Sequence, residues 1–162
     1  MVLMLTEGQV NGIWEKMVEA EVRSLYFGDL AAYYTRNKQV ITGLSFLLSS
    51  GAAATVAART SFWFPLVTSA ISAALSGYSI AVGLDRKAAT MAKLHSSWNE
   101  LHSGYERLWY HWGDDDAEAQ LDALQKQESS ASETGSVEAP YDVPRIEKWA
   151  QLVYERYERR AA

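Results

Sequence analysis

The sequence has no cysteine, few prolines and a long stretch that is almost free of charge. Without cysteine the chain can have no disulfide, no thiolate metal site and no cysteine nucleophile. Residues 39–84 contain one charged side chain, Arg59. The net negative charge is concentrated in residues 113–139, where eight acidic residues accompany one basic residue, Lys126. Because no basic cluster is present and the net charge is −5, the composition argues against nucleic-acid binding.

Two uncharged runs lie on either side of Arg59, over residues 40–58 and 60–84. A bilayer core about 30 Å thick requires about 20 apolar residues in a helix, so each run is long enough to cross it. The alternative is a pair of buried helices in a soluble core, but a chain of this length lacks the second layer needed to cover them. We therefore predict an all-α membrane protein with a two-helix transmembrane hairpin over residues 39–84.

The stretch AARTSFWFP, residues 57–65, is predicted to form the turn of this hairpin. Pro65 suits the first turn of the second helix, where a backbone N–H has no partner within the helix. Aromatic and basic side chains favour the membrane surface, and the predicted interface anchors are Arg59, Phe62, Trp63 and Phe64. Six basic residues flank the outer ends of the hairpin against one in the turn, so both termini are predicted to be cytoplasmic.

Small residues recur at every fourth position in both predicted spans. In lipid no hydrophobic drive brings helices together, and small side chains let their backbones approach closely. The predicted packing ridges are Ser45, Ser49, Ala53 and Ala57 in the first span and Ser69, Ala73, Gly77 and Ala81 in the second. Hydroxyl residues off these ridges, including Ser72 and Ser76, either bond to carbonyls of their own helix or line a wet path through a homo-oligomer.

Residues 85–127 are predicted to contain two cytoplasmic helices. The first is a stem helix, and the second is an acidic helix capped by Asp114. Apolar residues of the stem recur at alternating spacings of three and four, which is the pattern of a heptad seam. This seam consists of Met91, Leu94, Trp98, Leu101, Tyr105, Leu108 and Trp112. It can pair with a second copy or with the cytoplasmic amphipathic helix predicted within residues 1–38. The second pairing is favoured, because both helices leave the membrane on the same side.

The C-terminal part of the sequence is predicted to contain a linker and one more helix. Residues 128–141 are small, polar and weakly patterned, which is typical of a flexible linker. Residues 142–162 have the pattern of an amphipathic helix opened by Asp142 and Pro144. Its aromatic face either folds back onto the stem or docks a partner.

Few residue patterns in the chain point to chemistry. His95, His102 and Glu106 share a face of the stem, but two helical turns separate the histidines, which is too far for one zinc ion. The sequence has no glycine-rich phosphate loop, no serine elbow and no paired buried carboxylates. We therefore expect no enzyme, and no catalytic, metal or cofactor site.

The order of segments resembles a known group of membrane domains. IWEKMVEAEVRSLYFGDLAAYYTRNKQ precedes the two closely spaced spans, and KLHSSWNELHSGYERLWYHW follows them. Over about residues 10–112 this layout resembles the SLATT group of bacterial two-transmembrane domains, which is associated with SMODS and SLOG sensor proteins. The resemblance implies a multi-pass protein of the bacterial inner membrane that forms pores or perturbs the membrane in a defence or conflict system.

The resemblance assigns no catalytic residue, and we expect no sensor domain within these 162 residues. A separate sensor or regulator protein, or a diffusible ligand such as a nucleotide signal, would then trigger a homo-oligomeric effector. The alternative is a membrane-anchored adaptor or scaffold whose cytoplasmic helices bind a partner protein.

Overall fold

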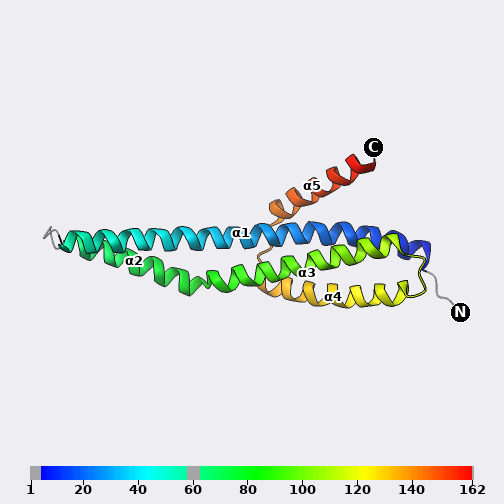
Figure 1. Cartoon of the computed structure of the whole chain (residues 1–162), viewed down its shortest axis with the longest axis horizontal. Coiled ribbons are helices and arrows are strands. Elements are labelled where there is room, and N and C mark those ends of the chain that lie inside the picture. The colour runs from blue at the N-terminus through cyan, green and yellow to red at the C-terminus, as the bar shows by residue number, and fades with distance from the viewer. Residues whose placement is uncertain (1–4, 58–62, 162) are drawn as a thin grey trace. The chain divides into compact units, whose positions relative to one another are not determined.

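The computed structural model describes residues 5–57 and 63–161, and these residues are helical almost throughout (Figure 1). They form five helices and no strand, which confirms the predicted all-α fold. The helices are α1 (Glu7–Ala57), α2 (Trp63–Val82), α3 (Leu84–Tyr110), α4 (Ala117–Glu138) and α5 (Val143–Ala161). The chain divides into a hairpin unit, Ala31–Ala89, and a bundle unit, Met1–Leu30 with Thr90–Ala162.

Side chains at the helix ends explain where several of these helices begin. Thr6 and Gln9 form a capping box at the start of α1: the Thr6 N–H donates to Oε1 of Gln9 at 2.8 Å, and the Gln9 N–H donates to Oγ1 of Thr6 at 3.3 Å. Asp142 opens α5 as predicted, because its Oδ1 accepts the Arg145 N–H at 3.2 Å. The structure differs from the predicted cap of α4, since Asp114 lies in the turn before that helix.

The core of the bundle unit is the seam predicted on the stem helix. Six of its seven residues, from Met91 to Leu108, are buried on α3. Trp112 lies beyond the end of α3 and is 46% exposed. The seam packs against the first part of α1, whose buried residues include Ile13, Met17, Ala20, Tyr26 and Phe27. Contacts such as Trp14 with Trp109 confirm the favoured pairing of the stem with the N-terminal helix.

The predicted linker is where the structure departs most from the sequence interpretation. Residues 128–138 continue α4 as regular helix, so the flexible segment predicted over 128–141 is wrong for most of its length. The inward face of α4 has a heptad spacing of its own, made of Ala117, Leu121, Leu124, Glu128, Ala131 and Gly135. Small residues on this face let α4 approach closely, and a Cβ built on Gly135 would lie 3.2 Å from Cζ of Phe27.

The C-terminal helix folds back onto α1. Val153 of α5 is fully buried in a cluster with Val18 and Val22 of α1. Tyr157 packs edge-on against Trp14 with ring centroids 4.8 Å apart, and Arg156 forms an ion pair with Glu21. Of the two alternatives for this helix, the structure therefore shows the fold-back, with α1 as the surface on which it lies.

In the hairpin unit the second part of α1 packs against α2. Hydroxyl groups join the two helices: Oγ of Ser72 lies 3.0 Å from Oγ of Ser49 and donates to the carbonyl oxygen of Ser45 at 3.2 Å. Gly83 follows the last residue of α2, and its φ of 64° is a left-handed conformation that costs other residues energy. α3 starts at the next residue, Leu84, which is buried.

Candidate functional site

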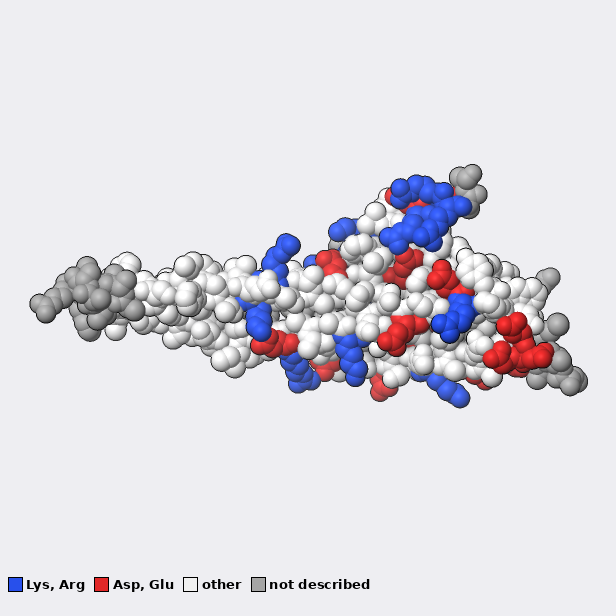
Figure 2. Space-filling model, in the orientation of Figure 1, with Lys and Arg blue, Asp and Glu red and all other residues white. Residues whose placement is uncertain are grey.

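The hairpin unit exposes an apolar surface that a water-soluble protein would normally cover. Side chains on both of its helices are open, with Phe46 71% exposed on α1 and Ile80 81% exposed on α2. The other large exposed residues of these helices include Val40, Leu44, Leu47, Leu66, Val67, Ile71 and Tyr78. Within Figure 2, most of the hairpin unit's visible face is without acidic or basic side chains. Continuous apolar surface of this kind marks contact with lipid or with other proteins.

One helical stretch among the described residues, Trp63–Tyr110, contains a window long and apolar enough to cross a membrane. Only 11% of that window is buried in the structure. A core helix of a soluble protein would be buried over most of such a window. The prediction of a membrane-spanning helix thus has support from length, composition and exposure together.

Charged residues resume on both helices of the hairpin at the same level. Nζ of Lys38, just before the uncharged part of α1, lies 2.5 Å from Oδ1 of Asp85, just after α2. One turn away, Nζ of Lys87 lies 5.9 Å from the ring centroid of Tyr34. The uncharged segments are therefore closed at one end by a pair of opposite charges. Sequence reasoning counted Lys38 and Lys87 only as basic flanks and did not identify Tyr34 or Asp85.

Aromatic residues lie at the start of α2, at the opposite end of that helix from the charged pair. Trp63 and Phe64 are both exposed, whereas Arg59 and Phe62, the other two predicted anchors, lie outside the described residues. The 20 residues of α2 span about 30 Å at a rise of about 1.5 Å each, close to the thickness of a bilayer core.

The predicted ridges are placed differently on the two helices. On α1, Ser45 and Ser49 contact α2, while the side chains of Ala53 and Ala57 lie outside the described residues. On α2 the ridge of Ser69, Ala73, Gly77 and Ala81 is exposed along its whole length, so it does not pack against α1. The face that does meet α1 consists of Thr68, Ser72, Leu75 and Ser79. On this face the Ser72 hydroxyl donates to the α1 carbonyl oxygen of Ser45, which stabilises the contact.

The two residues predicted to line a wet path, Ser72 and Ser76, lie in different surroundings. Ser72 is buried against α1 and bonded to it, so in a single hairpin it is a contact between helices; the structure differs here from the prediction. Ser76 is exposed. Thr68 bonds back to the carbonyl of Phe64 at 2.9 Å, which is the alternative considered for these hydroxyls.

The stem histidines bind the backbone of α1. Nδ1 of His95 lies 2.8 Å from the carbonyl oxygen of Ser24, and Nδ1 of His102 lies 3.2 Å from that of Met17. His95 and His102 are seven residues apart on α3, and their partners Ser24 and Met17 are seven residues apart on α1. The two contacts therefore join α1 and α3 at both ends of one heptad. In the part of the chain that the structure describes, no group of three metal-binding side chains occurs.

A buried carboxylate joins three helices of the bundle unit. Glu128 of α4 accepts a hydrogen bond from the Tyr105 hydroxyl of α3 at 2.7 Å and pairs with Lys16 of α1. We call these three residues the polar pin. Its hydrogen bond to Glu128 raises the pKa of Lys16, and burial raises the pKa of Tyr105 well above its usual value.

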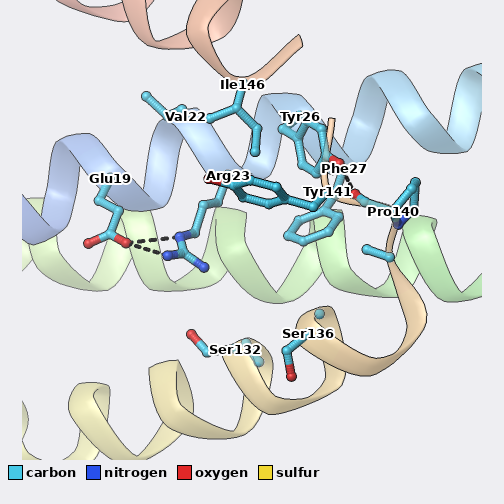
Figure 3. Close-up of a pocket in the computed structure, with 13 residues that line it drawn as sticks. Glu19, Val22, Arg23, Tyr26, Phe27, Ser132, Ser136, Pro140, Tyr141 and Ile146 are labelled. Carbon is cyan, nitrogen blue, oxygen red and sulfur yellow. Dashed lines mark hydrogen bonds and ion pairs between the residues drawn. The ribbon is translucent and has the colours of Figure 1, made fainter. Parts of the chain in front are cut away.

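A cavity of about 490 Å³ opens between α1, α4 and the segment that leads into α5 (Figure 3). Tyr26, Phe27 and Tyr141 supply aromatic walls. Its one basic side chain, Arg23, pairs with Glu19 at 2.6 Å and lies over the Trp98 ring at 4.7 Å. Both partners belong to the bundle unit itself, so the guanidinium stabilises that unit.

Comparison with known proteins found no match to a family model, to a curated protein or to a solved structure.

Proposed function

We propose that the protein is an oligomeric membrane effector whose hairpin unit crosses the bilayer twice with both termini in the cytoplasm. The single observation that carries this proposal is the exposed apolar surface of α1 and α2, which is bounded by the Lys38–Asp85 pair at one end of α2 and by Trp63 at the other. A bilayer supplies the cover that the chain itself does not, and basic residues favour the cytoplasmic side.

The ridge on α2 supports assembly as the next step. A Cβ built on Gly77 would meet no atom within 4 Å, so the close-approach surface of this helix is unused in one chain. A ridge of small residues is the usual contact between helices in lipid, and a second copy can use it. Assembly around exposed hydroxyls such as Ser76 would then admit water and perturb the membrane, in the manner that the resemblance to SLATT domains implies.

The bundle unit is the part that a separate sensor or a diffusible signal would act on in this proposal. The alternative is a membrane-anchored adaptor, in which the hairpin is only an anchor and the bundle unit recruits a partner protein. One observation favours it: Val137 near the end of α4 and Tyr141 just before α5 have exposed side chains, 78% and 85% open to solvent. Neither reading requires a catalytic residue.

A leucine placed on the ridge distinguishes the two functions. In Gly77→Leu the bulky side chain meets nothing within the hairpin but blocks close approach of a second copy. The matched control is Gly43→Leu, because Gly43 is also exposed, also has nothing within 4 Å and lies off the predicted ridges. Both changes raise hydrophobicity, so both variants should stay in the membrane.

The measurements are membrane fractionation, cross-linked oligomer size and dye-reported depolarisation of bacteria that overexpress each variant to a level at which mass action drives assembly without a trigger. We expect wild type and Gly43→Leu to form oligomers and depolarise cells, and Gly77→Leu to do neither. Recovery of the wild type in the soluble fraction would disprove the membrane proposal. Membrane-bound wild type without depolarisation would favour the adaptor, and oligomers in Gly77→Leu would show that the ridge is not the contact.

A further inference from the structure

We infer that the charged end of the hairpin unit is a binding site for the headgroup of an anionic phospholipid. The site is a basic collar made of Arg36, Lys38, Arg86 and Lys87, with Asp85 as its acidic member. The inference rests on the proposed insertion of the hairpin into a bilayer, and it adds which lipid the protein prefers and which residues select it.

The collar gathers cations from two helices that are distant in sequence. The ion pair between Lys38 and Asp85 places the start of the uncharged segment of α1 beside the end of the uncharged segment of α2. Four cations and one carboxylate leave three positive charges at this level of the hairpin unit. Arg36 and Arg86 are exposed, and both add to the net positive charge of this end of the hairpin unit.

The one carboxylate of the collar is a weak competitor for a phosphate group. The Asp85 side chain is 74% exposed and that of Lys38 is 45% exposed. An ion pair that is open to solvent contributes at most about 1 kcal/mol, because water screens it and two long side chains must be held in place. A lipid phosphate can therefore take Lys38 from Asp85 without leaving a buried charge unpaired.

An aromatic layer accompanies the cations. Lys87 lies over the ring of Tyr34, and the ring of Tyr34 packs edge-on against Tyr33 at 5.5 Å between centroids. Tyrosine favours the level of lipid headgroups, where its ring is partly apolar and its hydroxyl stays wet. Lysine extends its apolar stem along such a surface and keeps its ammonium group at the phosphate level.

The surroundings select a lipid over a free anion. The collar is continuous along the helices with exposed apolar side chains, Val40 on α1 and Ile80 on α2. A phospholipid satisfies both surfaces at once, with its phosphodiester on the cations and its acyl chains on the apolar residues. Inorganic phosphate satisfies only the collar.

The test compares lipid retention by two variants that lose the same charge. Lys38→Gln/Lys87→Gln removes two cations of the collar, and Arg159→Gln/Arg160→Gln removes two exposed cations of α5 in the bundle unit. Each protein is reconstituted into vesicles that contain equal amounts of phosphatidylcholine and phosphatidylglycerol, is re-extracted in mild detergent, and its co-purified lipid is identified by mass spectrometry. Resistance to carbonate extraction from the vesicles reports insertion separately.

We expect the wild type and the α5 variant to retain phosphatidylglycerol in preference to phosphatidylcholine. The collar variant should insert equally well but lose that preference by about 10- to 30-fold, since each of the two basic residues near an anionic surface contributes about fivefold. Equal retention of both lipids by the wild type, or an unchanged preference in the collar variant, would overturn the inference. So would release of the bound lipid by millimolar inorganic phosphate. Failure to insert would instead overturn the proposed function.

Discussion

Removal of the carboxylate at Glu128 tests whether the C-terminal part of α4 is packed helix. Its side chain is 12% exposed, and Glu128→Ala leaves the fully buried Tyr105 hydroxyl without its partner. An unpaired buried hydroxyl costs about 1–3 kcal/mol. Loss of the pair with Lys16, which is itself partly exposed, adds at most about 1 kcal/mol. We expect the free energy of unfolding of the bundle unit to fall by about 1–4 kcal/mol.

A double-mutant cycle isolates the polar pin from general damage to the helix. Tyr105→Phe removes the hydroxyl that Glu128→Ala leaves unpaired, so the double variant should be less destabilised than the sum of the two single variants. The control is Glu133→Ala, an exposed glutamate on the same helix. The assay is denaturant unfolding in detergent, followed by circular dichroism. Equal stability of the Glu128→Ala and Glu133→Ala variants would refute the packed helix and restore the linker interpretation.

Two further predictions concern the same bundle unit. Trp98→Ala should lower its free energy of unfolding by about 3–5 kcal/mol, because Trp98 is 1% exposed. The control Asn99→Ala, at an exposed position, should change it by less than about 0.5 kcal/mol. Equal unfolding midpoints of the two variants would show that the seam is not buried. The free energy of unfolding should also fall as the pH rises above about 10. The raised pKa of Tyr105 keeps the proton on its hydroxyl in the folded chain, whereas a tyrosine in the unfolded chain loses its proton in this range. The pKa of Lys16 is raised too, so Lys16 contributes in the same direction. In Tyr105→Phe this decline, measured between pH 9 and 11, should be shallower; an identical slope would contradict the assignment.

The sequence pattern predicted the packing of α3 but missed that of α4, although both have heptad spacing. On α3 the seam positions hold large apolar residues such as Trp98 and Leu101, which stand out from their neighbours. On α4 the corresponding positions include Glu128, Ala131 and Gly135. Small residues and a glutamate have no apolar signal, and the partners that bury them come from α1 and α3. The alternating spacing of three and four residues, considered without regard to how apolar the residues are, could have revealed this helix.

The hairpin shows a different limit of sequence reasoning. The absence of charge and the aromatic residues at its ends follow from composition, and the apolar exposure in the structure agrees with them. Which face of α2 meets α1 does not follow, because small residues occur around most of that helix. Every-fourth spacing selects Ser69 and Gly77 as readily as Thr68 and Ser72. In the structure the face that includes Ser72, whose hydroxyl bonds across to α1, is the one that meets α1.

This division of α2 into two faces bears on how a quiet effector could exist before it is triggered. Hydrogen bonds between membrane helices contribute roughly 0.6 kcal/mol each on average. In the proposed membrane-spanning hairpin, the bonds of Ser72 to α1 would stabilise a single chain without a second copy. The ridge that includes Gly77 takes no part in that contact and stays exposed. A hairpin built in this way can insert as a single chain and still keep a close-approach surface for assembly. Had the ridge packed against α1, assembly would have required the hairpin to open first, and a trigger acting on the bundle unit would have had to supply that energy.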